Sequence, residues 1–383
     1  MPPSHKYKLA KPAKSGRGLD RLLAIAALAA VIGLLWYFSR PAKPRHKAGS
    51  IATTPTTKPA PVNPPVQVEV SKTRIVIPAT DLTNTPAPEK IIPPPPDTAR
   101  KPHDVFETQV ALMRLGISAG SIDGALGSQT RAALRAFQRQ EKIPPTGNLD
   151  GETRNRLLLE TPALTSYVIT SNDLARLQPV SKTWLGKSQQ SALEYETALE
   201  LVSEKFHAHP KQIRLLNPAV DWTNVFFGTG VTVPDAAYPK PATKASWIVI
   251  SLAEKTLEAF DEQTNLLAHF PCSIAAKVEK RPAGELHVVA LAPNPNYTFN
   301  PEIFPEVPEA RSLTNKLILQ PGPNNPVGTV WISLDKPGYG MHGTPKPEDV
   351  GRTESHGCFR LANWNAEFLL KLAWVGLPVR VEP

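Results

Sequence analysis

The sequence predicts a multidomain α+β protein, and three stretches of differing pattern support this prediction. Residues 103–160 carry apolar side chains at helical spacing, with turn signals between the helices. Residues 166–235 mix strand-like and helical patterns. Residues 245–383 hold short β-branched or aromatic runs bounded by Pro, Gly and Asn, with one late helix. A chain of 383 residues is long enough for two or three such domains.

The N-terminal residues predict a membrane anchor. Residues 22–38 are seventeen positions without a charge, near the lower limit for a helix that crosses a bilayer, and six basic residues precede them. The positive-inside bias makes residues 1–21 a cytoplasmic tail, which predicts a single-pass inner-membrane protein whose C-terminal part is periplasmic or extracytoplasmic. We favour a retained anchor over a removed signal peptide, because Ser39-Arg40-Pro41 offers no small-x-small cleavage site.

Residues 39–102 are predicted to be a linker, because they contain fifteen prolines and no sustained apolar period. The net charge of +9 does not indicate a nucleic-acid partner. Residues 1–47 hold ten Lys or Arg and one acidic residue, 10 − 1 = +9, so the remaining chain is formally neutral. A nucleic-acid-binding protein carries its basic patch on a folded domain, and we therefore expect no nucleic acid to bind.

Residues 103–160 predict three short helices around one small core. Ser128 is suited to cap the second helix, and the third begins near Asp150. The segment resembles the three-helix peptidoglycan-binding domain of cell-wall hydrolases and transpeptidases. The residues that carry this resemblance are Asp123-Gly124, Gly127, Thr130, Ala133, Phe137-Gln138, Gly147 and Asp150-Gly151. A plain helical spacer is the alternative.

Residues 166–235 predict a small domain of βααβ order. A strand-like run at residues 166–170 opens it, two helical patterns lie between Tyr195 and Pro218, and a turn and strand at residues 228–234 close it. The stretch resembles a LysM module, and the resemblance implies binding of glycans that contain N-acetylglucosamine. About twenty extra residues separate the first strand from the helices, and Glu196 replaces the usual Gly-Asp.

The two cysteines differ in their surroundings. Cys272 follows the apolar run at residues 266–271, so we interpret it as a buried small hydrophobic residue. Cys358 lies in Ser355-His356-Gly357-Cys358-Phe359-Arg360-Leu361, sixteen positions after His342. A free thiol is only slightly ionised at neutral pH, so a catalytic cysteine needs a base, and histidine can supply one.

The site residues follow from this arrangement. His342 and His356 are both candidate bases, and we favour His342 because a separate strand delivers it more freely and the Gly343 carbonyl can hold its tautomer. Gly357 permits close approach of a substrate carbonyl, and its N–H with that of Cys358 is the candidate oxyanion site. Candidate substrate contacts are Arg360, His356, Ser355 and Tyr339. Zinc needs three or four ligands at recognisable spacing, so we expect no metal or other cofactor.

The same residues, with His342-Gly343-Thr344 and Asn363, resemble the signature of the L,D-transpeptidase (YkuD-type) catalytic domain. Further matches are Arg281-Pro282-Ala283-Gly284-Glu285 and the run at residues 321–328. The resemblance implies a mostly-β fold over residues 245–383 and acyl transfer in peptidoglycan. A cysteine takes the acyl group of a tetrapeptide stem, releases D-Ala and passes the acyl group to an amine, forming 3–3 cross-links. The first histidine, here His342, is the base.

That resemblance also implies the partners, which are peptidoglycan stem peptides, glycan strands and carbapenem-type inhibitors. The acceptor stays open, because a second stem, water, a D-amino acid or a lipoprotein lysine each fit the residues. A carboxypeptidase, a lipoprotein-attaching enzyme and a non-catalytic wall-binding scaffold are therefore the alternatives.

Overall fold

The computed structural model describes residues 99–304, 306–353, 355 and 357–383. The predicted tail, the anchor at residues 22–38 and nearly all of the linker lie outside these residues. Among the residues described, no helix is long and apolar enough to cross a membrane. The structure therefore gives the predicted single-pass inner-membrane location no support, and we withdraw it. The longest described helix, α3 (Ser128–Gln140), has 13 residues, whereas a bilayer needs about 20 apolar ones.

The first described segment has the three expected helices, α2 (Val105–Arg114), α3 and α4 (Gly151–Arg156). Asp104 and Asp150 cap α2 and α4 by accepting backbone N–H groups. The Gln138 side chain is fully buried and connects α3 to α4 through Thr153, and to the turn between them through Gly147 and Asn148. Ser128 does not cap α3 as predicted, because it is the first residue of that helix and Gly127 precedes it without a side-chain cap. Caps on α2 and α4 and a satisfied buried amide thus stabilise this short three-helix segment.

The next segment has the expected βααβ order with two additional short helices. Strand β1 (Leu164–Val168) pairs antiparallel with β2 (Gly230–Pro234), and α7 (Ala198–Lys205) and α8 (Pro210–Leu216) lie between them in the chain. The extra residues form α5 (Ser171–Ala175) and α6 (Trp184–Ser188).

The C-terminal segment is built on one sheet of eight strands, in the order β11-β10-β9-β6-β12-β3-β4-β5. Its strands are β3 (Trp247–Ser251), β4 (Thr256–Phe260), β5 (Leu266–Pro271), β6 (Gly284–Pro293), β9 (Val330–Leu334), β10 (Gly340–His342), β11 (Phe359–Arg360) and β12 (Pro378–Glu382). Helix α9 (Asn363–Leu372) packs on it, and a separate hairpin is formed by β7 (Tyr297–Phe299) and β8 (Leu317–Leu319). Three 3₁₀ turns lie in the connections described, η1 (Val278–Lys280), η2 (Pro308–Ser312) and η3 (Pro347–Asp349). The predicted multidomain α+β fold is confirmed.

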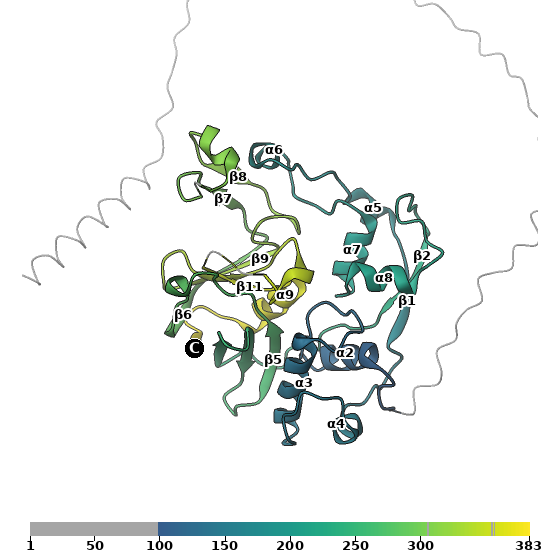
Figure 1. Cartoon of the computed structure of the whole chain (residues 1–383). Coiled ribbons are helices and arrows are strands. Elements are labelled where there is room, and N and C mark those ends of the chain that lie inside the picture. Colours follow the sequence, from purple (N-terminus) through teal and green to yellow (C-terminus); the bar gives the residue numbers. More distant parts are fainter. Residues whose placement is uncertain (1–98, 305, 354, 356) are drawn as a thin grey trace, which may run out of the picture. The chain divides into compact units, whose positions relative to one another are not determined.

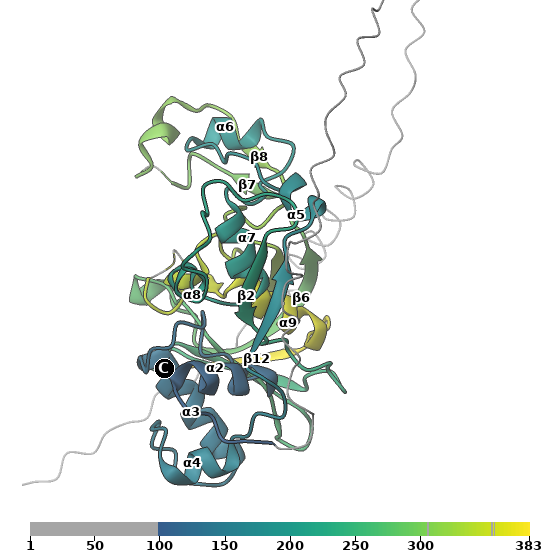
Figure 2. The same cartoon turned by 90° about the vertical axis from the view of Figure 1, so that its right-hand side faces the viewer.

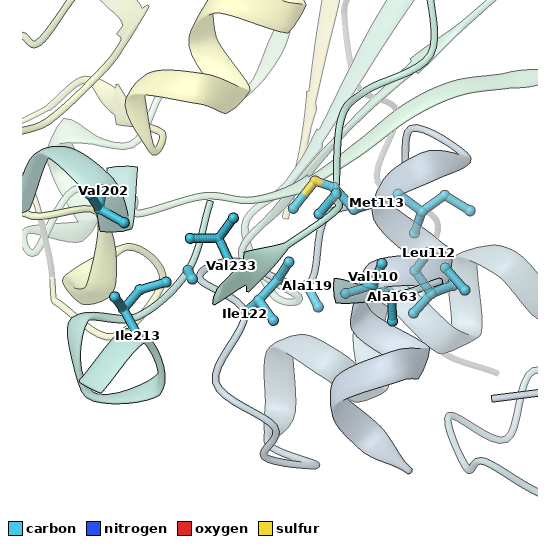
Figure 3. Packing of buried hydrophobic residues seen from close by; sticks show 14 of the residues in the cluster. Val110, Leu112, Met113, Ala119, Ile122, Ala163, Val202, Ile213 and Val233 are labelled. Atoms are coloured by element: carbon cyan, nitrogen blue, oxygen red, sulfur yellow. The ribbon is translucent and has the colours of Figure 1, made fainter. Parts of the chain in front are cut away.

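The two N-terminal segments share a single apolar core instead of having one each. Figure 3 shows Val110 and Leu112 of α2 in the same cluster as Val202 of α7, Ile213 of α8 and Val233 of β2. Ile122 joins the segments through the backbone, because its N–H donates to His207 and its carbonyl accepts from His209. Sequence periodicity cannot reveal a core shared in this way.

The C-terminal segment has its own core, and a third, smaller cluster lies at the β7–β8 hairpin. Figures 1 and 2 show this hairpin beside α6, and α3 lies beside the edge strand β5 in Figure 1. The N-terminal segments therefore contact the C-terminal segment both at the β7–β8 hairpin and at the edge strand β5.

Candidate active site

Strand pairing places His342 and Arg360 on one face of the sheet. Strands β10 and β11 are parallel, with Met341 opposite Phe359 and His342 opposite Arg360. Met341 and Phe359 are buried in the core below the sheet. Because successive side chains alternate between faces, His342 and Arg360 lie on the opposite face, and Cys358 directly precedes β11.

The Cys358 side chain is partly exposed, and backbone groups of the preceding loop hold it. Its thiol donates to the Gly338 carbonyl at 3.4 Å, and the Gly340 N–H donates to the sulfur. Burial raises the pKa of Cys358, whereas the Gly340 N–H and the charge of Arg360 oppose this rise. The resting group is therefore a thiol, which needs a base before it can attack.

His342 is the residue suited to be that base. Its side chain is buried, and Nδ1 lies 2.6 Å from the Gly343 carbonyl oxygen. Since a carbonyl oxygen only accepts, Nδ1 carries the proton and Nε2 keeps a free lone pair. Burial lowers the pKa of His342 to about 4, against the opposing effect of the Gly343 bond, so the imidazole is neutral at pH 7.

Ser355 fixes the turn before the cysteine. Its hydroxyl donates to the Cys358 carbonyl at 2.6 Å and accepts from the Gly357 N–H at 3.3 Å. Ser355 is buried, and both bonds hold the turn, while its contact with a substrate stays a prediction. The Gly357 N–H, which the sequence offers as an oxyanion donor, is already bonded in this structure.

Arg360 and Tyr339 remain candidates for substrate contacts. The guanidinium of Arg360 is half-buried and makes no ion pair within the described residues, while its backbone pairs with Ser273. An unpaired guanidinium beside a thiol is suited to hold a carboxylate. The Tyr339 ring lies against Gly357, where an added Cβ would stand 3.6 Å from the ring. His356 lies outside the described residues.

Asn363 anchors the loop that carries the base. Its side chain is buried, and Oδ1 accepts the N–H of Thr344 at 3.0 Å and of Thr329 at 3.2 Å. A Cβ at Gly343 would stand 2.1 Å from this oxygen, which explains the glycine there. The sequence pattern contains Asn363 but does not indicate what it holds.

Two aromatic neighbours of the site were not predicted. Trp331 of β9 lies opposite His342, and the two rings stack with centroids 5.4 Å apart. Tyr297 of the β7–β8 hairpin has its pKa raised to about 12, chiefly by burial and then by the nearby Cys358. The sequence places Trp331 in a strand, but pairing between strands distant in the chain decides what it faces.

Two parts of the chain match known protein families. Residues 245–381 match the family model described as "L,D-transpeptidase catalytic domain", and residues 102–157 match "Putative peptidoglycan binding domain". A "Putative L,D-transpeptidase YkuD" of Bacillus licheniformis is 26% identical over 48% of this chain and 93% of its own length. The Bacillus subtilis protein of the same name is 24% identical over 43% of this chain and 81% of its own.

A solved structure, L,D-transpeptidase 3 from Mycobacterium tuberculosis, is 17% identical over 42% of this chain and 77% of its own, with a TM-score of 0.29. That score is too low to support an argument about the site.

Proposed function

Residues 245–381 form an L,D-transpeptidase catalytic domain, and we propose that it acts by cysteine acyl transfer with Cys358 as nucleophile and His342 as general base. The observations that carry this proposal are a neutral imidazole at His342 on β10 and a neutral thiol at Cys358, which directly precedes the parallel neighbouring strand β11. The Gly343 carbonyl orients the imidazole so that its free nitrogen, Nε2, can accept the thiol proton.

The first half of the reaction acylates the enzyme. Nε2 of His342 takes the thiol proton as the sulfur bonds to the carbonyl carbon of the diamino acid in a tetrapeptide stem. The C–N bond to the terminal D-Ala then breaks, the imidazolium returns the proton to the leaving amine, and a thioester remains on Cys358.

The second half transfers the acyl group. An acceptor amine attacks the thioester, loses a proton to His342, and displaces the sulfur, which is reprotonated. With the amine of a second stem as acceptor, the product is a 3–3 cross-link.

An oxyanion donor and two candidate substrate contacts complete the proposed site. The Cys358 N–H stabilises the oxyanion, a contribution of about 3–4 kcal/mol per donor in comparable enzymes. Because the Gly357 N–H is bonded to Ser355, it joins only if that 3.3 Å bond opens. Arg360 binds a stem carboxylate, and Tyr339 lines the approach beside Gly357.

The N-terminal segments supply the wall-binding part of the proposal. Residues 102–157 match a peptidoglycan-binding family, and β1, α7, α8 and β2 have the βααβ order of a LysM module. We assign both to binding of peptidoglycan, with glycan strands as the ligand of the second. Co-sedimentation of the Cys358→Ala chain with insoluble peptidoglycan tests this assignment, and a chain left wholly in the supernatant would contradict it.

The catalytic proposal is tested with a carbapenem and intact mass measurement. We expect the wild-type chain to gain one inhibitor mass and Cys358→Ala to gain none. Cys272→Ala is the matched control, because Cys272 is fully buried and its modification is not expected. An adduct on Cys358→Ala, or none on the wild type, would refute the nucleophile.

The acceptor is resolved by muropeptide analysis of purified disaccharide tetrapeptide after incubation with the enzyme. Dimers with 3–3 links support the transpeptidase, whereas tripeptides alone indicate the carboxypeptidase. The absence of any product together with binding to the wall would favour the non-catalytic scaffold.

A further inference from the structure

A carboxylate from outside the catalytic domain reaches the group that supports the base. Glu204 lies on α7 of the βααβ segment, and its side chain is almost completely buried. Its Oε1 accepts from Nδ2 of Asn363 at 2.7 Å, across 159 positions of the chain. Sequence separation of this size shows that folding of both segments is needed to form the bond.

Glu204 determines which way the Asn363 amide points. Nδ2 of Asn363 donates to Glu204 and, at 3.3 Å, to the Pro323 carbonyl, while Oδ1 accepts two backbone N–H groups. All hydrogen-bonding positions of the amide are thus used, two as donor and two as acceptor. If the Glu204 carboxyl is removed, one donor bond is lost and the amide is held less firmly.

The amide in turn fixes the acceptor that orients His342. The Thr344 N–H, which bonds to Asn363, and the Gly343 carbonyl, which bonds to His342, belong to the same peptide group. That group is planar, so its two polar ends move together. A hydrogen bond at the N–H end also polarises the carbonyl and strengthens it as an acceptor.

We propose that Glu204 is a positioning residue for His342, acting through Asn363 and the Gly343–Thr344 peptide. This inference rests on the proposed function of His342. It means that correct folding of the βααβ segment is a requirement for an aligned catalytic base, in addition to any binding of the wall by that segment.

The charged surroundings of Glu204 are well defined. Burial and the carboxylates of Glu200, Glu367 and Glu348 raise the pKa of Glu204 to about 8, while the Asn363 bond opposes the rise. A cavity of about 300 Å³ lies beside it, and the lysines that line this cavity are Lys182, Lys187 and Lys346. Both the neutral and the charged carboxyl can accept from Asn363, so the bond persists on both sides of this pKa.

The test measures the second-order rate of carbapenem acylation as a function of pH in the full chain. For Glu204→Ala and for Glu204→Asp, which draws the carboxyl back by one methylene, we expect a loss of roughly tenfold and a displaced acid limb. Glu204→Gln keeps an oxygen acceptor and is expected to restore most of the rate. The displaced limb separates positioning from stability, because a purely structural role would lower the melting temperature only.

Glu200→Ala is the matched control. Glu200 lies on the same helix and also crosses to the C-terminal segment, where it accepts from Asn324 at 2.6 Å, but its side chain makes no hydrogen bond to Asn363 or to the Gly343–Thr344 peptide. We expect its rate and pH profile to match the wild type. Wild-type kinetics in folded Glu204→Ala or Glu204→Asp would overturn the inference, whereas an unreactive wild type would instead refute the proposed function. If Glu204→Ala does not fold, the Glu204→Asp and Glu204→Gln pair decides the outcome.

Discussion

The environment of His342 explains why this imidazole can act as a base in spite of a buried position. Burial excludes the charged form, and the stacked Trp331 ring and the Gly343 carbonyl hold the neutral ring in one orientation. Both groups are thus neutral at rest, and in the proposed mechanism charge develops only when the substrate carbonyl is present. An imidazolium–thiolate pair, as often found beside reactive cysteines, is disfavoured by the directions of both pKa shifts.

This environment predicts the pH dependence of acylation. Protonated His342 cannot accept the thiol proton, so activity is lost as the pH falls through the pKa of the histidine. Because that pKa is about 4 in place of 6.5, we expect the acid limb of carbapenem acylation to have its midpoint near pH 4. Stopped-flow measurement across the acid range checks this, and a midpoint near 6.5 would show that the imidazole is not buried as described.

The candidate catalytic residues, His342 and Cys358, could be predicted from the sequence more readily than the hydrogen bonds around them. The spacing of His342 and Cys358, with the glycine before the cysteine, nominates both without structural information. The use of the Ser355 hydroxyl and the Gly357 N–H within the turn could not be predicted, because it depends on how a four-residue loop closes.

The β7–β8 hairpin and α6 pack against each other, and Tyr297 of this hairpin lies near Cys358. Trp184 of α6 stacks on Phe299 of β7 with centroids 4.1 Å apart. The Glu309 carboxylate accepts the N–H groups of Trp184 and Leu185 at 2.8 and 2.9 Å. The hairpin that brings Tyr297 towards Cys358 is therefore supported by residues inserted in the βααβ segment.

We expect Trp184→Ala to loosen this hairpin selectively. Loss of the stacked ring removes buried apolar area from a cluster of only a few side chains, so the free energy of local unfolding of the hairpin falls. Hydrogen exchange should become faster at residues 297–319 and remain slow in the central strands. Trp247→Ala is the control, since Trp247 stacks on Phe260 in the main sheet. Unchanged exchange of the hairpin in Trp184→Ala would contradict the supporting role.

The sequence predicts regular strands better than these irregular elements. Residues 247–251 and 256–260 are two of the short β-branched or aromatic runs of the C-terminal segment, and they form β3 and β4 because turn residues bound them locally. The hairpin was not predicted, since Trp184 and Phe299 are more than one hundred positions apart and their contact leaves no local pattern.

At the level of the whole described chain, the three-helix segment protects an edge of the sheet. The Ser118 N–H donates to the His269 carbonyl of β5 at 2.8 Å, and the His269 N–H donates to Gly116 at 3.1 Å. Arg139 of α3 also forms an ion pair with Glu258, which is hydrogen-bonded to His269. An edge strand without such cover is prone to pair with other chains.

Removal of residues 1–240 should therefore destabilise what remains. We expect the fragment of residues 241–383 to melt at a lower temperature than the full chain and to associate at high concentration, because β5 and α9 both lose their covering contacts. Differential scanning fluorimetry and light scattering measure these effects. A monomeric fragment with unchanged melting temperature would show that the segments fold independently.

The order of the strands has one further consequence. Strand β5 at one edge of the sheet contacts the three-helix segment, and β11 at the other edge directly follows Cys358. Seven inter-strand spacings of about 4.8 Å separate them, at most roughly 34 Å. A wall polymer bound by the three-helix segment beside β5 would thus react at Cys358 at a fixed distance from its binding site. The bound stretch and the reacting stem would then be different parts of the polymer.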